Sequence, residues 1–230
     1  MRSAGSTVND IADREFDGHV ERTRFRPLAN GQIGARSALV FLGVQLALAA
    51  SLLFFLAPYT HLIAICVLPL VFIYPICKRF THWPQAVLGA AFNWGMLMAW
   101  ADVAGHLPAG AVLMWTGAVT WQIGYDTVYA YVDVNDDIRL GLKSTAILFG
   151  RQGKACIGLL YALTLVAWSI GGSLLGMSMA YAIGMLVIAA HLTWQTWRLD
   201  LTRPEVNFQL FLSNILTGAL LACTAFIGTR

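Results

Sequence analysis

Residues 37–57 read SALVFLGVQLALAASLLFFLA, a run without a single charged side chain. A helix needs about 20 mostly apolar residues to cross the hydrocarbon core of a bilayer. The whole chain has a similar character, because 58% of its 230 residues are hydrophobic, 12% are charged and the mean hydropathy is +0.65. Soluble domains carry about 25% charged residues. The sequence therefore predicts an integral membrane protein.

Six further apolar segments complete the pattern, at residues 60–77, 84–101, 109–129, 153–176, 178–197 and 207–228. None shows the strict alternation of a barrel strand, and a segment in lipid must satisfy its own backbone hydrogen bonds. We predict an all-α fold, a polytopic transmembrane helical bundle with a single membrane domain over residues 1–230. Bends or helix starts are expected at Pro69, Pro75 and Pro84. Close helix approach is expected at Gly43, Gly89, Gly95, Gly117 and Gly158.

The connections between these segments alternate in charge. Four of them, residues 9–36, 78–83, 126–154 and 198–206, hold thirteen of the fifteen Lys and Arg residues. The opposite connections hold none. By the positive-inside rule the charged face is cytoplasmic, or its organellar equivalent. Of these two, we expect the cytoplasmic face of a bacterial inner membrane. The same face holds eleven of the twelve acidic residues, all except Asp102. Topology does not require this gathering of carboxylates.

Most of these carboxylates fall into two arrays with helical spacing. The first, NDIADREFD, begins at Asn9 and places acids at Asp10, Asp13 and Asp17. The second, DTVYAYVDVNDD, places them at Asp126, Asp133 and Asp137. Spacings of three, four and seven residues put each set on one face of a helix. Both arrays are therefore expected to present their carboxylates together.

A bound cation would remove the repulsion within such arrays. Mg²⁺ fits, because it takes one or two carboxylates, keeps several waters and completes its shell with phosphate oxygens. Two facing arrays predict a diphosphate clamp. For one array alone, a solvated helix end would be the better interpretation. Basic residues beside the arrays suit an anionic substrate, although positive-inside loops carry them for topology as well: Arg22, Arg24, Arg26, Lys78, Arg79, Arg139 and Lys143.

Three stretches resemble a known family. They are NDIADREFDGHVERTRFRPLANG from Asn9, YPICKRFTHWPQAVLGAAFNWG from Tyr74, and YDTVYAYVDVNDDIRLGLKSTAILFG from Tyr125. The first and third resemble the two diagnostic motifs of the UbiA-type membrane aromatic prenyltransferases, which make quinone precursors. The likeness is strongest to the 4-hydroxybenzoate branch. It covers the whole chain, although the last three helices match only in their spacing.

The resemblance implies a barrel-like fold of nine helices and Mg²⁺-dependent transfer of a polyprenyl chain. The donor would be polyprenyl diphosphate, and the acceptor would be 4-hydroxybenzoate, at the ring position beside the hydroxyl, in ubiquinone biosynthesis. This chain would lack the family's first helix and most of the second, which leaves about seven full helices. Membrane lipid is an expected partner and nucleic acid is not; the oligomeric state stays open.

The resemblance also implies roles for individual residues. Metal ligands or supporting acids would be Asn9, Asp10, Asp13, Asp17, Asp126, Asp133 and Asp137. Substrate would be held by Asn9, Arg22, Arg26, Lys78, Arg79 and Lys143. Besides Asp133 and Asp137, the catalytic set would include Tyr125 and Tyr129, whose rings could stabilise an allylic cation. Trp and Tyr also gather at membrane interfaces for structural reasons, which is the simpler interpretation of each aromatic residue.

Three alternatives remain open at this point. The acceptor could be another aromatic compound, or haem as in haem O synthesis. In another class, acidic arrays could form the entry of a cation transporter, but transporters carry ionisable residues near the membrane midplane. The interiors of residues 37–77 and 153–197 contain no Asp or Glu. The third alternative is an inactive truncated membrane protein.

Overall fold

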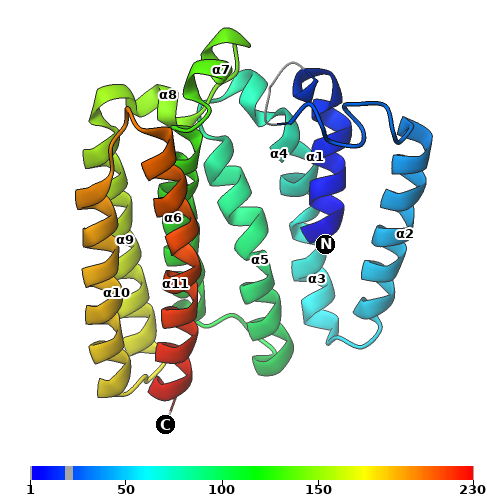
Figure 1. Ribbon diagram of the computed structural model, residues 1–230. Helices are drawn as coiled ribbons and strands as arrows, with labels where there is room; N and C mark the ends of the chain where they lie inside the picture. The colour runs from blue at the N-terminus through cyan, green and yellow to red at the C-terminus, as the bar shows by residue number, and fades with distance from the viewer. Residues whose placement is uncertain (1, 19–22, 230) are drawn as a thin grey trace.

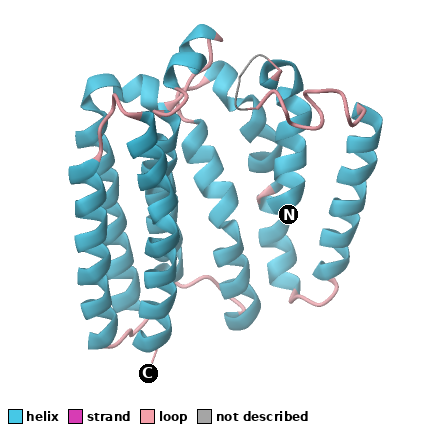
Figure 2. Ribbon diagram, in the orientation of Figure 1, coloured by secondary structure: helices cyan, strands magenta, loops and turns pink. Residues whose placement is uncertain are grey.

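The structure, a computed structural model, describes residues 2–18 and 23–229. Within these ranges all of the regular secondary structure is helical, and no described residue lies in a β-strand (Figure 2). The seven predicted spans are confirmed as helices or helix pairs. In chain order they are α2 (Ala35–Leu53), α3 (Pro58–Cys66) with α4 (Leu68–Phe80), α5 (Pro84–Ala104), α6 (Ala109–Ala130), α9 (Gly153–Leu174), α10 (Met179–Arg198) and α11 (Pro204–Gly228).

Five helical stretches are long and apolar enough to cross a membrane, at residues 35–53, 58–80, 84–104, 145–174 and 204–228. The remaining two predicted spans, α6 and α10, are 22 and 20 residues long. They pack among the other helices in one bundle (Figure 1). The chain is an integral membrane protein.

The second span is divided at Val67, as its prolines predicted. Pro69 lies in the first turn of α4 and has no N–H to continue the hydrogen bonding of α3. Pro75 lies inside α4, and Pro84 begins α5. These positions match the preference of proline for helix starts. The division leaves Tyr74 and Lys78 on the short helix α4, which ends at the charged face.

Three short elements lie at the charged face of the bundle: α7 (Val134–Arg139), α8 (Thr145–Phe149) and the 3₁₀ turn Gly150–Gln152. Helix α1 (Arg2–Asp17) packs beside α2 and α4, and its C-terminal end reaches the same face (Figure 1). Figure 1 shows α7 and α8 at one end of the bundle, together with the connection that follows α1. The opposite end carries the turns α2–α3, α5–α6 and α9–α10. Both acidic arrays therefore reach the same end of the molecule.

The packed core lies between α6 and α9. The Trp168 side chain is fully buried, and its indole N–H donates to the Met114 carbonyl over 3.1 Å. Gly117 faces this indole so closely that a Cβ there would collide with it. Close approach is also confirmed at Gly89, where a Cβ would lie 3.1 Å from the Val119 carbonyl oxygen.

Two of the glycine predictions are wrong. Gly43 and Gly95 have open space where a Cβ would be placed. Gly43 is exposed and Gly95 lines a hollow beside α4, so no close approach requires a glycine at either position. At Gly158 the nearest atom to a Cβ would be the Thr196 methyl carbon, at 3.3 Å, which is a tight but adjustable contact.

Candidate functional site

The first acidic array lies on the last two turns of α1. Asp13 and Asp17 are 2% and 7% exposed. The Arg26 guanidinium ties the array together, because its Nη1 lies 3.0 Å from Asp10 Oδ1 and 2.8 Å from Asp17 Oδ2. The Thr23 hydroxyl donates to the Asp17 carbonyl over 3.0 Å. Burial raises the pKa of the Asp10 carboxyl, and the nearby Arg26 opposes that rise.

Asp13 has the most unusual environment in this array. One carboxylate oxygen, Oδ2, accepts a hydrogen bond from Lys78 Nζ over 2.6 Å. The other, Oδ1, is buried and has no hydrogen-bond partner within the described part of the chain. A buried unsatisfied carboxylate oxygen is costly, and such atoms often mark a bound ion or ligand.

The second array does not form one continuous helical face, contrary to the prediction. Helix α6 ends at Ala130 and α7 begins at Val134, so Asp126 and Asp137 lie on different helices. Residues 131–133 lie in the turn between the two helices, where Tyr131 is buried and its hydroxyl donates to the Gly150 carbonyl over 2.8 Å. Asp133 is the N-cap residue of α7, and its side chain makes no capping hydrogen bond. The carboxylates still converge, through the turn rather than along a helix.

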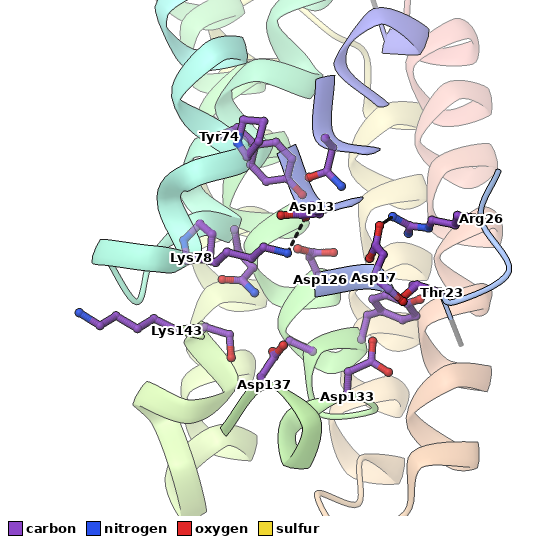
Figure 3. A pocket seen from close by; sticks show the side chains of 17 residues that line it. Asp13, Asp17, Thr23, Arg26, Tyr74, Lys78, Asp126, Asp133, Asp137 and Lys143 are labelled. Atoms are coloured by element: carbon purple, nitrogen blue, oxygen red, sulfur yellow. Dashed lines mark hydrogen bonds and ion pairs between the residues drawn. The ribbon is translucent and has the colours of Figure 1, made fainter. Parts of the chain in front are cut away.

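Both arrays open onto one pocket of about 250 Å³. Figure 3 shows Asp13, Asp17 and Asp126 gathered in it, with Asp133 and Asp137 at another part of its wall. The pocket is lined by Asn9, Asp13, Asp17, Thr23, Arg26, Tyr74, Pro75, Lys78, Pro84, Gln85, Asp126, Tyr129, Ala130, Asp133, Asp137, Lys143 and Ser144. Most of the predicted site residues are thus brought together from α1, α4, α6 and α7.

Three of the predicted site residues that the structure describes are not in the pocket wall, namely Asp10, Arg79 and Tyr125. Asp10 pairs with Arg26 and lines a neighbouring hollow between α1 and α2. The Arg79 guanidinium donates to the Ala12 carbonyl over 2.9 Å and is not in the pocket wall. Lys143 lines the pocket, but its Nζ donates to the Phe80 carbonyl, and Figure 3 shows its side chain pointing away from the carboxylates. Tyr125 lies one turn deeper than Tyr129. Arg22 lies outside the described residues.

Several pocket residues were not predicted. Gln85, Ser144 and Thr23 are uncharged and lie outside the acidic arrays, so their residue types gave no indication of a site. Ser144 caps α8, where its hydroxyl oxygen accepts the Ile147 N–H. Gln85 follows Pro84 at the start of α5 and is 6% exposed.

An aromatic wall extends from the pocket along α6 and α11. The Tyr129 ring lies 4.5 Å from the Phe211 ring and 6.3 Å from the Phe208 ring, measured between centroids. Tyr125 is 5.9 Å from Phe211 and 5.0 Å from Trp121. The two α11 phenylalanines were not predicted, because about 80 residues separate them from Tyr129 and only the fold brings them together.

The donor set fits a hard divalent cation that is shared with a phosphate ligand. Among the described residues, no three His, Cys, Asp or Glu side chains lie close enough to hold a metal by themselves. Mg²⁺ does not need such a cage, since one or two carboxylates, waters and phosphate oxygens complete its shell. The unpartnered Oδ1 of Asp13 supplies a carboxylate oxygen of the required kind.

The comparison with family models gives a match over residues 1–221 to the UbiA prenyltransferase family. The chain belongs to this family. Relatives at about 40% identity align with nearly the whole length of this chain. The 4-hydroxybenzoate octaprenyltransferase of Pseudomonas aeruginosa is 41% identical over 229 residues, which cover 100% of this chain and 76% of that protein. The protein of the same name from Hydrogenovibrio crunogenus is 41% identical, with 100% and 80% covered.

Solved UbiA structures share the fold. A UbiA homologue from Aeropyrum pernix superposes with a TM-score of 0.80 at 25% identity, covering 96% of this chain and 84% of that one. A homologue from Archaeoglobus fulgidus, solved with GPP and Mg²⁺ bound, gives a TM-score of 0.71 at 18% identity, with 99% and 83% covered. The resemblance inferred from the motifs is therefore confirmed, and the chain is a UbiA-family prenyltransferase.

Proposed function

We propose that this UbiA-family chain transfers a polyprenyl group from polyprenyl diphosphate to 4-hydroxybenzoate, at the ring carbon beside the hydroxyl, in ubiquinone biosynthesis. The observation that carries the proposal is the single pocket onto which both acidic arrays open, with one oxygen of Asp13 buried and unpartnered. The acceptor is inferred from the names of the bacterial relatives.

Asn9, Asp13 and Asp17 would hold one Mg²⁺, and Asp133 and Asp137 the other, with Asp10 and Asp126 as supporting acids. Bound Mg²⁺ neutralises the charge that develops on the diphosphate oxygens as the group leaves. GPP and Mg²⁺ are the ligands of the Archaeoglobus fulgidus protein. At its low identity that likeness supports the fold alone, so the metal proposal depends on the residues of this chain.

The cationic side chains would bind the diphosphate. Arg26 and Lys78 line the pocket with their charged ends on Asp17 and Asp13. This pairing orders both cations before substrate arrives and leaves some of their N–H donors for phosphate oxygens. Lys143 is at the pocket wall, and its ammonium would have to leave the Phe80 carbonyl to take part.

An apolar groove beside the pocket suits the start of the polyprenyl chain. It has a volume of about 260 Å³ and lies between α3–α4 and α5. Tyr74 lines both the groove and the carboxylate pocket. The remaining wall is apolar or aromatic: Val67, Val71, Leu88, Ala91, Phe92, Trp94, Gly95 and Met98. A chain bound there would have its diphosphate among the carboxylates and its hydrocarbon away from water.

The reaction begins when the bond between the prenyl C1 and the diphosphate oxygen breaks, and diphosphate leaves with the electron pair. The resulting allylic cation is stabilised by nearby aromatic faces. Tyr129 is the best placed of these because it lines the pocket, and Tyr125 lies one turn deeper on α6. The electron-rich ring carbon beside the acceptor hydroxyl then attacks C1, and the ring proton passes to the released diphosphate or to water, which restores aromaticity. The cation must be shielded from water to avoid hydrolysis, and the apolar groove and the aromatic wall would provide that shielding.

We further infer that the carboxylate pocket faces the cytoplasm of a bacterial inner membrane, from the distribution of Lys and Arg.

The test of the function uses membranes that contain the full chain, supplied with octaprenyl diphosphate and 4-hydroxybenzoate. Prenylated product is expected with Mg²⁺ and absent with a chelator. Membranes without the chain are the control. No product under any divalent metal condition, or equal product with the chelator, would contradict the proposal.

A further inference from the structure

Gln85 connects the wall of the carboxylate pocket to the segment that follows the second array. Its side chain is 6% exposed and lines the pocket. Its Oε1 accepts the backbone N–H of Thr145 over 3.2 Å. Two residues earlier, the Lys143 N–H donates to the Lys78 carbonyl over 2.8 Å. These two bonds fix Lys143 and Ser144 against α4 and α5.

The contacts of Thr145 determine which end of the Gln85 amide faces it. The Thr145 backbone N–H can only donate. The Gln85 atom that receives it must therefore be the carbonyl oxygen, and the other end of the amide is the NH₂ group.

An NH₂ group on a residue that lines this pocket is suited to a negatively charged ligand. It has two N–H donors and no acceptor capacity. We propose that Gln85 is a substrate-binding residue whose Nε2 donates to a diphosphate oxygen while Oε1 holds the start of α8. This inference depends on the proposed function, because the ligand is the diphosphate of the prenyl donor. It adds a neutral, bifunctional contact that neither acidic array supplies.

The Gln85→Glu variant separates the two roles of this side chain. A glutamate keeps an acceptor for the Thr145 N–H but replaces the donor with a negative charge that repels diphosphate. We expect the KM for octaprenyl diphosphate to rise about 10- to 100-fold, the range for losing a hydrogen bond to a charged group. The KM for 4-hydroxybenzoate should change little. Gln85→Met removes both the donor and the acceptor without adding charge, and it should raise the same KM about tenfold.

The matched control is Gln152→Glu, an exposed glutamine on the same membrane face outside the pocket, which should behave as the unchanged chain does. If the unchanged chain forms product and Gln85→Glu has the same KM for octaprenyl diphosphate, Gln85 has only a structural role and the inference fails. If the unchanged chain forms no product, the proposed function fails instead.

A second measurement needs no variant. Pyrophosphate with Mg²⁺, added to the unchanged chain, should slow backbone hydrogen exchange in the segment 143–149, because a ligand on Nε2 immobilises the amide that holds Thr145. Unchanged exchange in that segment under saturating pyrophosphate would overturn the inference, even if the Gln85 variants do not fold.

Discussion

Lys78 Nζ lies 2.6 Å from Oδ2 of Asp13, and this ion pair joins α4 to α1 across the carboxylate pocket. Asp13 is 2% exposed, and the Lys78 side chain is 27% exposed. Both side chains line the pocket, and Lys78 is the more exposed member of the pair. The pair provides both the charge balance of a buried acid and a cation at the wall where a diphosphate would bind.

Removal of the lysine charge should destabilise the protein. We expect Lys78→Met to lower the free energy of unfolding by about 3 kcal/mol, because it leaves the Asp13 carboxylate buried without a counter-charge. The double variant Lys78→Met, Asp13→Asn should recover most of that loss. Thermal unfolding in detergent measures both. A double variant that is no more stable than Lys78→Met would show that the ion pair does not account for the loss.

Replacement of the aromatic ring at the pocket wall should slow the chemical step. We expect Tyr129→Leu to lower kcat about 2- to 30-fold, the range for losing one cation–π contact of roughly 0.5–2 kcal/mol. The KM for the prenyl donor should stay nearly constant. Tyr129→Phe keeps the ring and should retain most of the activity. Equal losses of kcat in the two variants would assign the effect to the hydroxyl instead of the ring.

The contact between α6 and α9 should be sensitive to a single added methyl group. A Cβ at Gly124 would lie 2.5 Å from a ring carbon of Tyr161, whose hydroxyl is bonded to Gln195 in the core. Gly124→Ala should therefore cost about 1–3 kcal/mol through overpacking. Gly43→Ala, on a helix face with open space, should be neutral or slightly stabilising. A similar melting temperature for both variants would contradict this view of the packing.

The sequence predicted the spans well, because long apolar runs and charged connections act through the bilayer itself. It also predicted that the two acidic arrays meet, since topology alone brings their ends to one face. It did not predict the break between α6 and α7. Helical spacing from Asp126 to Asp137 suggested one face, but α6 ends at Ala130 and Asp133 lies in the turn before α7.

The sequence also did not predict the direction in which individual side chains point. Arg79 and Lys143 have the residue type for phosphate binding, yet their charged ends donate to the Ala12 and Phe80 carbonyls. Gln85 lies in the stretch quoted from Tyr74, but neither it nor Phe211 has a charge that marks it as a site residue. Their positions at the site follow from the packing of α5 and α11, which depends on contacts far apart in the chain.

The most direct test of the proposed site compares three neighbouring carboxylates in the second array. Product formation is measured against Mg²⁺ concentration for the unchanged chain, for Asp133→Asn with Asp137→Asn, and for Asp136→Asn. Asp136 is in the same short helix but does not line the pocket, and it pairs with Arg139 over 3.7 Å. The double variant should lose at least about 100-fold in product formation or require far more Mg²⁺, because it removes two of the proposed metal ligands. Asp136→Asn should follow the curve of the unchanged chain. Full activity of the double variant at the same Mg²⁺ concentration would contradict a metal-assisted diphosphate site in this pocket.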